Sequence, residues 1–354
     1  MECDAGSIVK THVFVKANLT DDRHLQSAPS GVDMVSYRPL GRTGLNVSTL
    51  SMGSGGYNRL GQTSDPPLTE PEMHRLVHGV LDLGINLFDT SPGYLEAEAI
   101  LGRAFQGIPR DRFYVATRVV LSKFDEERGP VLMTPEHITD SIETSLRRLG
   151  IDAIDVALIA ATETADFGYM INEQFPVLER LCQQGKIRFL GSSETALSDG
   201  SHAWLRAALP TGKLDVIMIA YSMLNQSARH SVFPYCREHD VGVMNIFSVR
   251  NIFKDPSRLK ETIEELQRQE LLDESIDPKA PYDFLLEDPE IDTLVEAAYR
   301  FVVNTEGVTT AVCSAVTLDK IEQNIHSIAR GPLPEMHVKR IRQLFGHISE
   351  PVGN

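Results

Sequence analysis

The sequence predicts an α/β protein whose eight parallel strands, each followed by a helix, close into a (β/α)8 TIM barrel. Short apolar runs alternate along the chain with segments of helical periodicity. These runs are continuous, which is typical of parallel strands covered by helices on both faces. Eight such pairs fit within about 280 residues, a length that favours a closed barrel over an open doubly wound sheet.

The eight pairs follow one another in order. The expected strands are residues 48–54, 85–89, 113–118, 155–160, 187–193, 215–220, 241–248 and 308–315. The expected helices are residues 70–84, 96–105, 134–150, 173–185, 199–209, 227–239, a long helical region after strand seven, and 317–329. In the third helix Thr134 can act as the N-cap and Pro135 can occupy the first helical position.

Three segments do not follow the barrel repeat. Residues 37–50 predict an N-terminal β-hairpin with a glycine-rich turn between Leu40 and Leu45. Residues 1–36 have no clear period and are expected to form a flexible arm, so that 37–354 make up one barrel domain. An extended segment after strand seven, 251–289, is expected to be partly helical. It is either a lid over the strand ends or a surface excursion.

Composition limits the function. The chain has 354 residues, 42% of them hydrophobic, without an apolar run of about eighteen residues or a signal peptide. We therefore expect a soluble, cytoplasmic protein. The net charge of −15 argues against a nucleic-acid or membrane partner. The four cysteines lack CxxC spacing, which indicates reduced thiols and no zinc site.

Motifs of other chemistries are incomplete. The stretch GYNRLGQT, 56–63, has the glycine spacing of a phosphate loop, but Gln62 stands where the lysine must be. We interpret its glycines as turn residues. His74 and His78 have the i, i+4 spacing of metal ligands without a third ligand, so we expect a solvated helix flank and no metal. Neither GxSxG nor HExxH is present, and nothing indicates a hydrolase.

An apolar strand ends in an acid in the stretch NLFDTSPGY, 86–94. Because functional groups gather at the carboxyl ends of barrel strands, Asp89 and the nearby Tyr94 are candidate catalytic residues. A tyrosine can donate a proton as a general acid if a nearby cation lowers its pKa. Arg118, at the end of strand three, is expected to be that cation, with Asp89 as its counter-ion. The alternative is that Asp89 caps the loop and Tyr94 only packs.

Several stretches taken together resemble the aldo-keto reductases: YRPLGRTGLNVSTLSMG, GINLFDTSPGY, RDRFYVATR, GKIRFLGSS and EQNI. The resemblance covers Tyr37 to Arg330. The DTSP box and the ending VTTAV…LDKIEQNI look most like the L-galactose and D-arabinose dehydrogenases. The resemblance implies a barrel that binds NADPH or NADH without a Rossmann domain and transfers hydride between the nicotinamide and a carbonyl or alcohol. It also implies an Asp, Tyr, Lys and His tetrad.

Only half of that tetrad is present. Asp89 and Tyr94 match, but Arg118 stands at the lysine position, and it keeps the charge on a planar guanidinium that does not deprotonate. The histidine position falls on Ala160. Losing one hydrogen-bond donor to a developing oxyanion typically costs about 100- to 1000-fold in rate. A water in the space beside Ala160, or Glu163 reaching in, could substitute for it.

The resemblance also implies a cofactor groove with altered residues. Ser193 matches the residue that holds the nicotinamide carboxamide, while Glu194 replaces an asparagine and Met218 a glutamine. Phe247 replaces the stacking tyrosine and keeps the aromatic face. Lys320 could meet a 2′-phosphate. The other candidate cofactor residues are Ser248, Arg250 as a pyrophosphate contact, Ser314 in place of a glycine, and Gln323 and Asn324 at the adenine edge.

The expected substrate is a small carbonyl or alcohol compound in a partly apolar pocket. The candidate lining residues are Tyr57, Phe124, Ala160, Glu163, Phe167 and Tyr169.

Three hypotheses about the function follow. The chain is an oxidoreductase that uses NADP(H), with NAD(H) as the alternative cofactor. It is otherwise a redox-silent dehydratase, isomerase or cyclase that uses Tyr94 and Glu194 without a cofactor, or a non-catalytic binding or regulatory subunit.

Overall fold

The computed structural model describes residues 35–125, 129–160, 167–194 and 199–349. Side chains are described for these residues except at 123–125 and 129–130. All of the described residues belong to the compact unit Asp33–Asn354. The expected N-terminal arm lies outside them, apart from its last two residues.

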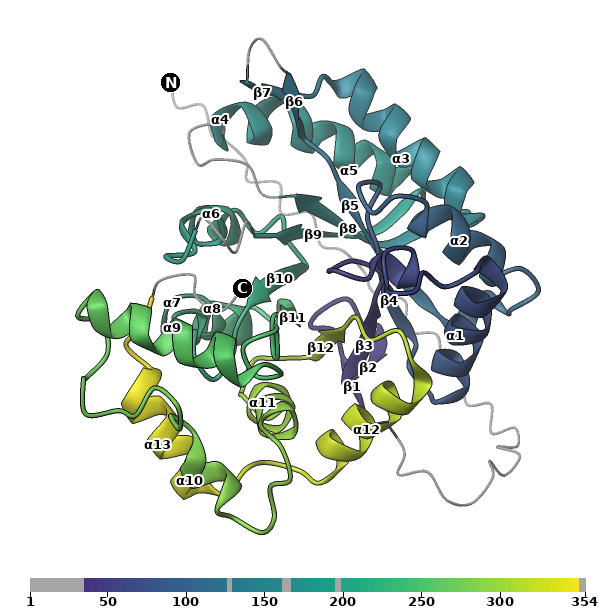
Figure 1. Ribbon diagram of the computed structural model, residues 1–354. Helices are drawn as coiled ribbons and strands as arrows, with labels where there is room; N and C mark the ends of the chain where they lie inside the picture. The colour runs from purple at the N-terminus through teal and green to yellow at the C-terminus, as the bar shows by residue number, and fades with distance from the viewer. Residues whose placement is uncertain (1–34, 126–128, 161–166, 195–198, 350–354) are drawn as a thin grey trace, which may run out of the picture. The chain divides into compact units, whose positions relative to one another are not determined.

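Eight parallel strands close into a barrel, which confirms the predicted fold class (Figure 1). Around the barrel the strands are β3 (Leu50–Gly53), β4 (Leu87–Asp89), β5 (Tyr114–Val119), β8 (Ile154–Ala160), β9 (Ile187–Ser193), β10 (Val216–Ala220), β11 (Gly242–Ile246) and β12 (Thr310–Cys313). Six of the predicted strands contain the observed one, and β5 and β8 each extend one residue beyond the predicted range. Because all eight run in one direction, their carboxyl ends meet at one mouth.

The helices lie outside the strands (Figure 1). They are α1 (Glu70–Asp82), α2 (Ala97–Ala104), α3 (Pro135–Leu149), α4 (Phe167–Tyr169), α5 (Phe175–Gln183), α6 (Ala203–Ala208), α7 (Ala228–Ser231), α8 (Phe233–Glu238), α9 (Pro256–Arg268), α10 (Asp283–Leu286), α11 (Leu294–Val303), α12 (Leu318–Ala329) and α13 (Glu335–Phe345). Pro135 begins α3 as predicted. Thr134 precedes it, but its hydroxyl contacts His137 Nδ1 at 3.1 Å and caps no backbone N–H. None of the described helices has the length and apolar composition that crossing a membrane requires.

The predicted N-terminal hairpin is present and belongs to the barrel interior. Strands β1 (Tyr37–Pro39) and β2 (Asn46–Ser48) pair in antiparallel fashion. Leu40 is fully buried in the same apolar cluster as barrel residues such as Val216 and Met244. A Cβ on Gly242, the first residue of β11, would lie 2.8 Å from Leu40 Cδ1. The hairpin therefore packs into the amino-terminal end of the barrel, opposite the mouth.

Alternation along the strands decides which side chains face the lumen. On β4 Leu87 belongs to the interior cluster and Phe88 to the layer between strands and helices. On β5 Ala116 belongs to the interior and Val115 to the outer layer. Since successive strand residues point to opposite faces, Asp89, two residues after Leu87, lies on the lumen side. The same reasoning places Arg118 beside it.

A second hairpin follows strand β5, and it was not predicted. Strands β6 (Ser122–Asp125) and β7 (Gly129–Leu132) pair in antiparallel fashion. The buried amide of Gln174 holds the base of this hairpin by donating to the carbonyls of Leu121 at 3.0 Å and Met133 at 2.8 Å. Because Gln174 lies 53 residues after Leu121 and 41 residues after Met133 in the chain, the strand pattern alone does not reveal these contacts. Phe124, a candidate pocket residue, lies in β6, but its side chain is outside the described part of the structure.

The segment after strand β11 is partly helical, as predicted, through α9 and α10. Tyr282 in this segment stacks against Phe345 of α13, with ring centroids 4.7 Å apart. The carboxylate of Asp288 meets His337 Nε2 of the same helix at 2.8 Å. Helix α13 thus joins the segment to the barrel layer, a contact that the sequence reasoning did not anticipate.

Candidate active site at the mouth of the barrel

A buried ion pair lies at the carboxyl ends of β4 and β5. The guanidinium of Arg118 donates to Asp89 Oδ1, and both side chains are almost fully buried. Arg118 Nη1 also donates to the carbonyl oxygen of Thr90 at 2.8 Å, and Nη2 lies 2.9 Å from Met218 Sδ on β10. Such contacts fix the orientation of the planar guanidinium. The structure thus brings together the expected cation and its counter-ion.

Burial governs the protonation of Asp89. Desolvation raises the pKa of this carboxyl group to about 6, although Arg118 opposes the rise. At neutral pH the carboxylate is therefore ionised and holds Arg118. Below about pH 6 Asp89 takes up a proton, and Arg118 loses its negatively charged partner.

The ring of Tyr94 lies between two arginines. The guanidinium carbon of Arg59 lies 4.7 Å from the ring centroid and that of Arg118 lies 5.4 Å from it. Burial raises the pKa of Tyr94, whereas Arg118 and Arg59 lower it, and burial outweighs them. Arg118 lowers the pKa of Tyr94, as expected, but burial keeps the net pKa above its ordinary value. The phenol is neutral at neutral pH, and the two cations instead surround the place where a phenolate would form.

Two residues that the sequence reasoning did not assign to the site hold Tyr94 in position. A Cβ on Gly55 would lie 2.6 Å from a ring carbon of Tyr94 and 3.0 Å from its hydroxyl oxygen, so only glycine leaves room for the phenol. The amide of Gln62 donates to the carbonyls of Arg59 at 2.8 Å and Tyr94 at 3.2 Å, and it accepts from the N–H of Glu96 at 3.0 Å. Gln62 thus joins the loop after β3 to the Tyr94 loop.

Strand pairing brings together the residues that are expected to lie around the nicotinamide carboxamide of the cofactor. Ser193, the last residue of β9, pairs with Ala160 on β8 and with Met218 on β10. These three positions therefore lie side by side at the mouth, next to Arg118. Ala160, where the resemblance places a histidine, contributes no hydrogen-bonding side chain. Glu163, its suggested substitute, lies outside the described residues.

Glu194 has a different environment from the one expected. Its carboxylate side chain has no exposed surface. Oε2 lies 2.6 Å from His202 Nδ1, and Oε1 accepts from the N–H of Ala220 at 2.6 Å. His202 Nε2 continues the chain of hydrogen bonds to Ser227 Oγ at 2.8 Å. The carboxylate is thus buried and already bound, an environment that does not favour its predicted contact with a nicotinamide carboxamide. Glu194 instead joins the loops that follow β9 and β10.

The loop after β11 presents an aromatic ring and a cation. Phe247 and Arg250 have left-handed backbone φ values of 65° and 47°, and the guanidinium carbon of Arg250 lies 3.1 Å from the centroid of the Phe247 ring. Burial lowers the pKa of Arg250 to about 10, so it stays cationic at neutral pH. No hydrogen bond or ion pair to this guanidinium occurs within the described residues. Ser248 is buried, and its hydroxyl donates to Asn245 Oδ1 at 2.5 Å.

The adenine-side candidates lie on the neighbouring unit, β12 and α12. Ser314 follows β12, and its Oγ would be 2.7 Å from a Cβ on Gly53 of β3. Lys320 and Gln323 are exposed in the first turns of α12. Asn324 is half-buried and donates to Cys313 Sγ at 3.3 Å. The N-cap residue of α12 makes no side-chain cap hydrogen bond, so the first N–H groups of α12 and Lys320 together suit a phosphate.

The described pocket candidates differ in exposure. Tyr57 is 69% exposed on the loop after β3, and Tyr169 is 39% exposed on α4. Phe167 packs edge-on against the buried Trp204, with ring centroids 5.6 Å apart. Tyr57 and Tyr169 are therefore free to meet a ligand, while Phe167 is largely committed to its own scaffold.

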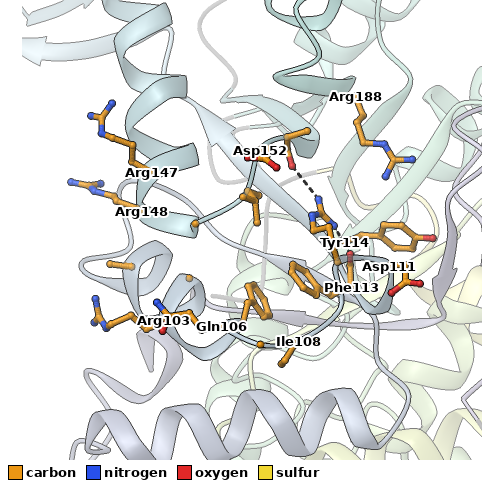
Figure 2. Close-up of a pocket in the computed structure, with 18 residues that line it drawn as sticks. Arg103, Gln106, Ile108, Asp111, Phe113, Tyr114, Arg147, Arg148, Asp152 and Arg188 are labelled. Atoms are coloured by element: carbon orange, nitrogen blue, oxygen red, sulfur yellow. Dashed lines mark hydrogen bonds between the residues drawn. The ribbon is translucent and has the colours of Figure 1, made fainter.

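A cavity of about 1000 Å³ lies at the opposite end of the barrel (Figure 2). Its lining includes Tyr114, the first residue of β5, and Arg188, near the start of β9. Figure 2 shows Arg103, Arg147 and Arg148 extending toward one open side from the ends of α2 and α3. Two other arginines are held by the fully buried Asp155: Arg110 Nη2 at 2.5 Å and Arg188 Nη1 at 2.6 Å. This end of a barrel serves stability, and the reacting groups lie at the other end.

Comparisons with known proteins agree with this geometry. The model of the Aldo/keto reductase family matches residues 50–345. The chain is 31% identical over 227 residues to an NADH-specific methylglyoxal reductase of Escherichia coli (strain K12), a match that covers 59% of this chain and 66% of the relative. It is 32% identical over 218 residues to an L-galactose dehydrogenase of Arabidopsis thaliana, covering 60% of this chain and 64% of that protein.

These matches span slightly less than two thirds of the relatives' own lengths. Among solved structures, an aldo-keto reductase from Bacillus halodurans in its holo form superimposes with a TM-score of 0.67. That similarity covers 89% of this chain and 97% of the other at 23% identity. At this identity the structural similarity shows the fold alone.

Proposed function

This chain belongs to the aldo/keto reductase family, and from that premise we propose that it is an NADP(H)-dependent oxidoreductase acting on a carbonyl or alcohol compound. The observation that carries the proposal is the position of the Tyr94 ring between Arg59 and Arg118, with Asp89 bound to Arg118. In the reducing direction Tyr94 donates its proton to the carbonyl oxygen. The two cations stabilise the phenolate that remains.

The other residues of the mouth support this step. Asp89 holds the guanidinium of Arg118 in one orientation, and Gly55 leaves the space that the phenol occupies. Ala160 gives the carbonyl no hydrogen bond, so we expect a rate below that of a complete tetrad by about 100-fold.

The residues present suit a nicotinamide dinucleotide, which supplies the hydride when bound. Ser193 would hold the carboxamide and Phe247 the ring face. Arg250, a half-buried cation without an acid partner in the described part of the chain, would meet the pyrophosphate. Lys320, exposed in the first turn of α12, favours a 2′-phosphate and hence NADPH over NADH. One relative is described as NADH-specific, so the two nucleotides must be compared directly.

The redox-silent alternative has less support. It required Glu194 to act with Tyr94 as an acid and base pair, but the Glu194 carboxylate is buried and bound by His202 and the N–H of Ala220. In the non-catalytic alternative the protein binds the cofactor in the same groove but catalyses no reaction. A single variant of Tyr94 separates it from the proposal.

The test begins with binding. Purified protein is titrated with NADPH and NADH while nucleotide fluorescence is followed, and we expect tighter binding of NADPH. Methylglyoxal, an uncharged carbonyl compound named for one relative, is then supplied as a probe substrate. Tyr94→Phe should keep the NADPH affinity and lose turnover by about 100- to 10,000-fold.

Two outcomes would contradict the proposal. If neither NADPH nor NADH at millimolar concentration changes the fluorescence, the oxidoreductase function is excluded. If NADPH binds and Tyr94→Phe turns over carbonyl probes as fast as the natural sequence does, Tyr94 is not the proton donor.

A further inference from the structure

Arg59 is a cation at the active-site mouth that the proposed reaction does not fully explain. It lies on the loop after β3, and its guanidinium covers the ring of Tyr94 at 4.7 Å. Arg118, on the same ring, is neutralised by Asp89. Arg59, by contrast, forms no ion pair and no side-chain hydrogen bond with any residue that the structure describes.

The backbone that carries Arg59 is strained. Arg59 and Leu60 have φ values of 44° and 60°, in the left-handed region that side chains larger than glycine rarely adopt. A residue in this conformation persists only where its surroundings enforce it. Here the Leu60 side chain is buried, and the Gln62 amide holds the carbonyls of Arg59 and Tyr94. The loop is therefore built to keep one arginine over the catalytic phenol.

The distribution of charge indicates what this arginine meets. Around the mouth, Asp89 and Arg118 cancel each other and Glu194 is enclosed with His202. Arg59 and Arg250 are left as cations without acid partners among the described residues, in a chain whose net charge is −15. Arg250 lies against Phe247 on the loop after β11, where it is proposed to meet the cofactor pyrophosphate. Arg59 lies against Tyr94, the group proposed to protonate the carbonyl oxygen.

We infer that Arg59 binds an anionic group of the substrate, so that the enzyme acts on carbonyl compounds carrying a carboxylate near the reacting carbon. This inference rests on the proposed oxidoreductase function and names its substrate class. A keto acid binds with its carboxylate on Arg59 and its carbonyl oxygen on Tyr94. An uncharged ketone leaves the guanidinium without a partner, and this difference is the source of selectivity.

The test uses two matched pairs of probes with NADPH: pyruvate against methyl pyruvate, and levulinate against methyl levulinate. Within each pair the reacting ketone is the same and only the charge differs. Both kcat/KM and the dissociation constant of the probe from the NADPH complex are measured. In at least one pair we expect the acid to be favoured over the ester by about 10- to 100-fold, the range of a hydrogen bond to a charged group.

The variant Arg59→Gln should slow both probes, because it removes one of the cations beside the Tyr94 phenolate, and should slow the acid by about a further 10- to 100-fold, so that the preference is lost. Arg59→Lys should retain part of the preference. Arg75→Gln, which removes one exposed charge from α1, is the control and should behave like the natural sequence. Equal values for acid and ester in both pairs overturn the inference, as does an Arg59→Gln variant that weakens both equally or weakens NADPH itself. Absence of NADPH binding instead overturns the proposed function, so the two failures are distinguishable.

Discussion

Asp89 and Tyr94 both have a raised pKa, and in both the largest cause is burial. Both groups are neutral acids that become anions, and the consequences differ because their ordinary pKa values, 3.8 and 10.0, lie on opposite sides of neutral pH. A raised pKa keeps the phenol of Tyr94 protonated and ready to donate. The same effect brings the pKa of Asp89 to about 6, within the range where an enzyme is assayed. The protonation of one buried carboxyl group thus controls the ion pair beside the proton donor.

We predict a pH profile of kcat/KM with a decline on the acid side of neutrality, which we call the acid limb. As pH falls through about 6, Asp89 takes up a proton, Arg118 loses its anchor, and kcat/KM for carbonyl reduction falls about tenfold per pH unit. On the alkaline side the rate stays level until above pH 10, because the pKa of Tyr94 is raised above its ordinary value of 10.0. Initial rates of NADPH oxidation with methylglyoxal measure the profile. The Asp89→Asn variant should be slow and lack the acid limb, and an unchanged limb would assign it to another group.

Space around the phenol is as important as charge. We predict that Gly55→Ala lowers kcat by about 100-fold, because the new methyl group would overlap the Tyr94 ring at 2.6 Å and a small displacement of a reacting group has an effect of this size. Gly93→Ala is the matched control. It lies one residue from Tyr94, and its Cβ would meet only Ser91 Oγ at an ordinary 3.6 Å. Equal activity of the two variants would show that the phenol tolerates displacement.

At the scale of elements, the loops after β9 and β10 are joined by a buried chain of polar groups. Glu194 accepts from Ala220 N–H and contacts His202, and His202 contacts Ser227, which precedes α7. Ser227 Oγ lies 3.1 Å from Asn225 Oδ1. Burial raises the pKa of Glu194, and the hydrogen bond from His202 opposes the rise. Fully satisfied networks of this kind hold loops in one arrangement. Ser193, directly before Glu194, is positioned by it.

We predict that Glu194→Ala lowers the free energy of unfolding by about 3 kcal/mol, because it leaves His202 and the Ala220 N–H without their acceptor in the interior. Glu179→Ala is the control. It removes an acid that pairs with Lys213 at the surface and should cost less than about 1 kcal/mol. Urea denaturation followed by circular dichroism measures both. Equal losses in the two variants would mean that the network contributes no more than a surface pair.

At the scale of the whole molecule, the unpaired charges described at the barrel mouth are positive, whereas the net charge of the chain is negative. The formal net charge is −15, yet the cations at the mouth without acid partners in the described part are Arg59 and Arg250. Near a surface cleft, local charges dominate the potential that a ligand meets, while distant ones are screened within about 8 Å at physiological salt. An acidic protein can therefore bind an anionic nucleotide at this place.

We predict that salt weakens NADPH binding. Raising potassium chloride from about 20 mM to about 500 mM should raise the dissociation constant by about tenfold, because the salt screens the attraction between the mouth and the phosphates. If the net charge governed the encounter, salt would instead tighten binding, so the sign of the effect decides. Arg250→Gln should flatten the dependence, and Arg75→Gln should leave it unchanged.

Prediction from the sequence succeeded where a local pattern carried the information. Apolar periodicity located the barrel strands and the N-terminal hairpin, and the position of Asp89 and Arg118 after apolar runs located the ion pair. Prediction failed where a residue of the site is held by a side chain from a distant loop. Gln62 was set aside as an incomplete phosphate loop, yet it holds Arg59 and Tyr94 together. Arg59 itself lies in no motif and was not expected to reach the site.

The sequence by itself determined the barrel and the order of its strands and helices, because apolar periodicity is a local property of the chain. Only the tertiary structure decided that Glu194 turns into the protein interior and that burial outweighs Arg118 in the pKa of Tyr94. Both depend on how loops from different strands pack against one another. Desolvation and hydrogen-bond partners arise from that packing, and neither can be read from the residues on one loop alone.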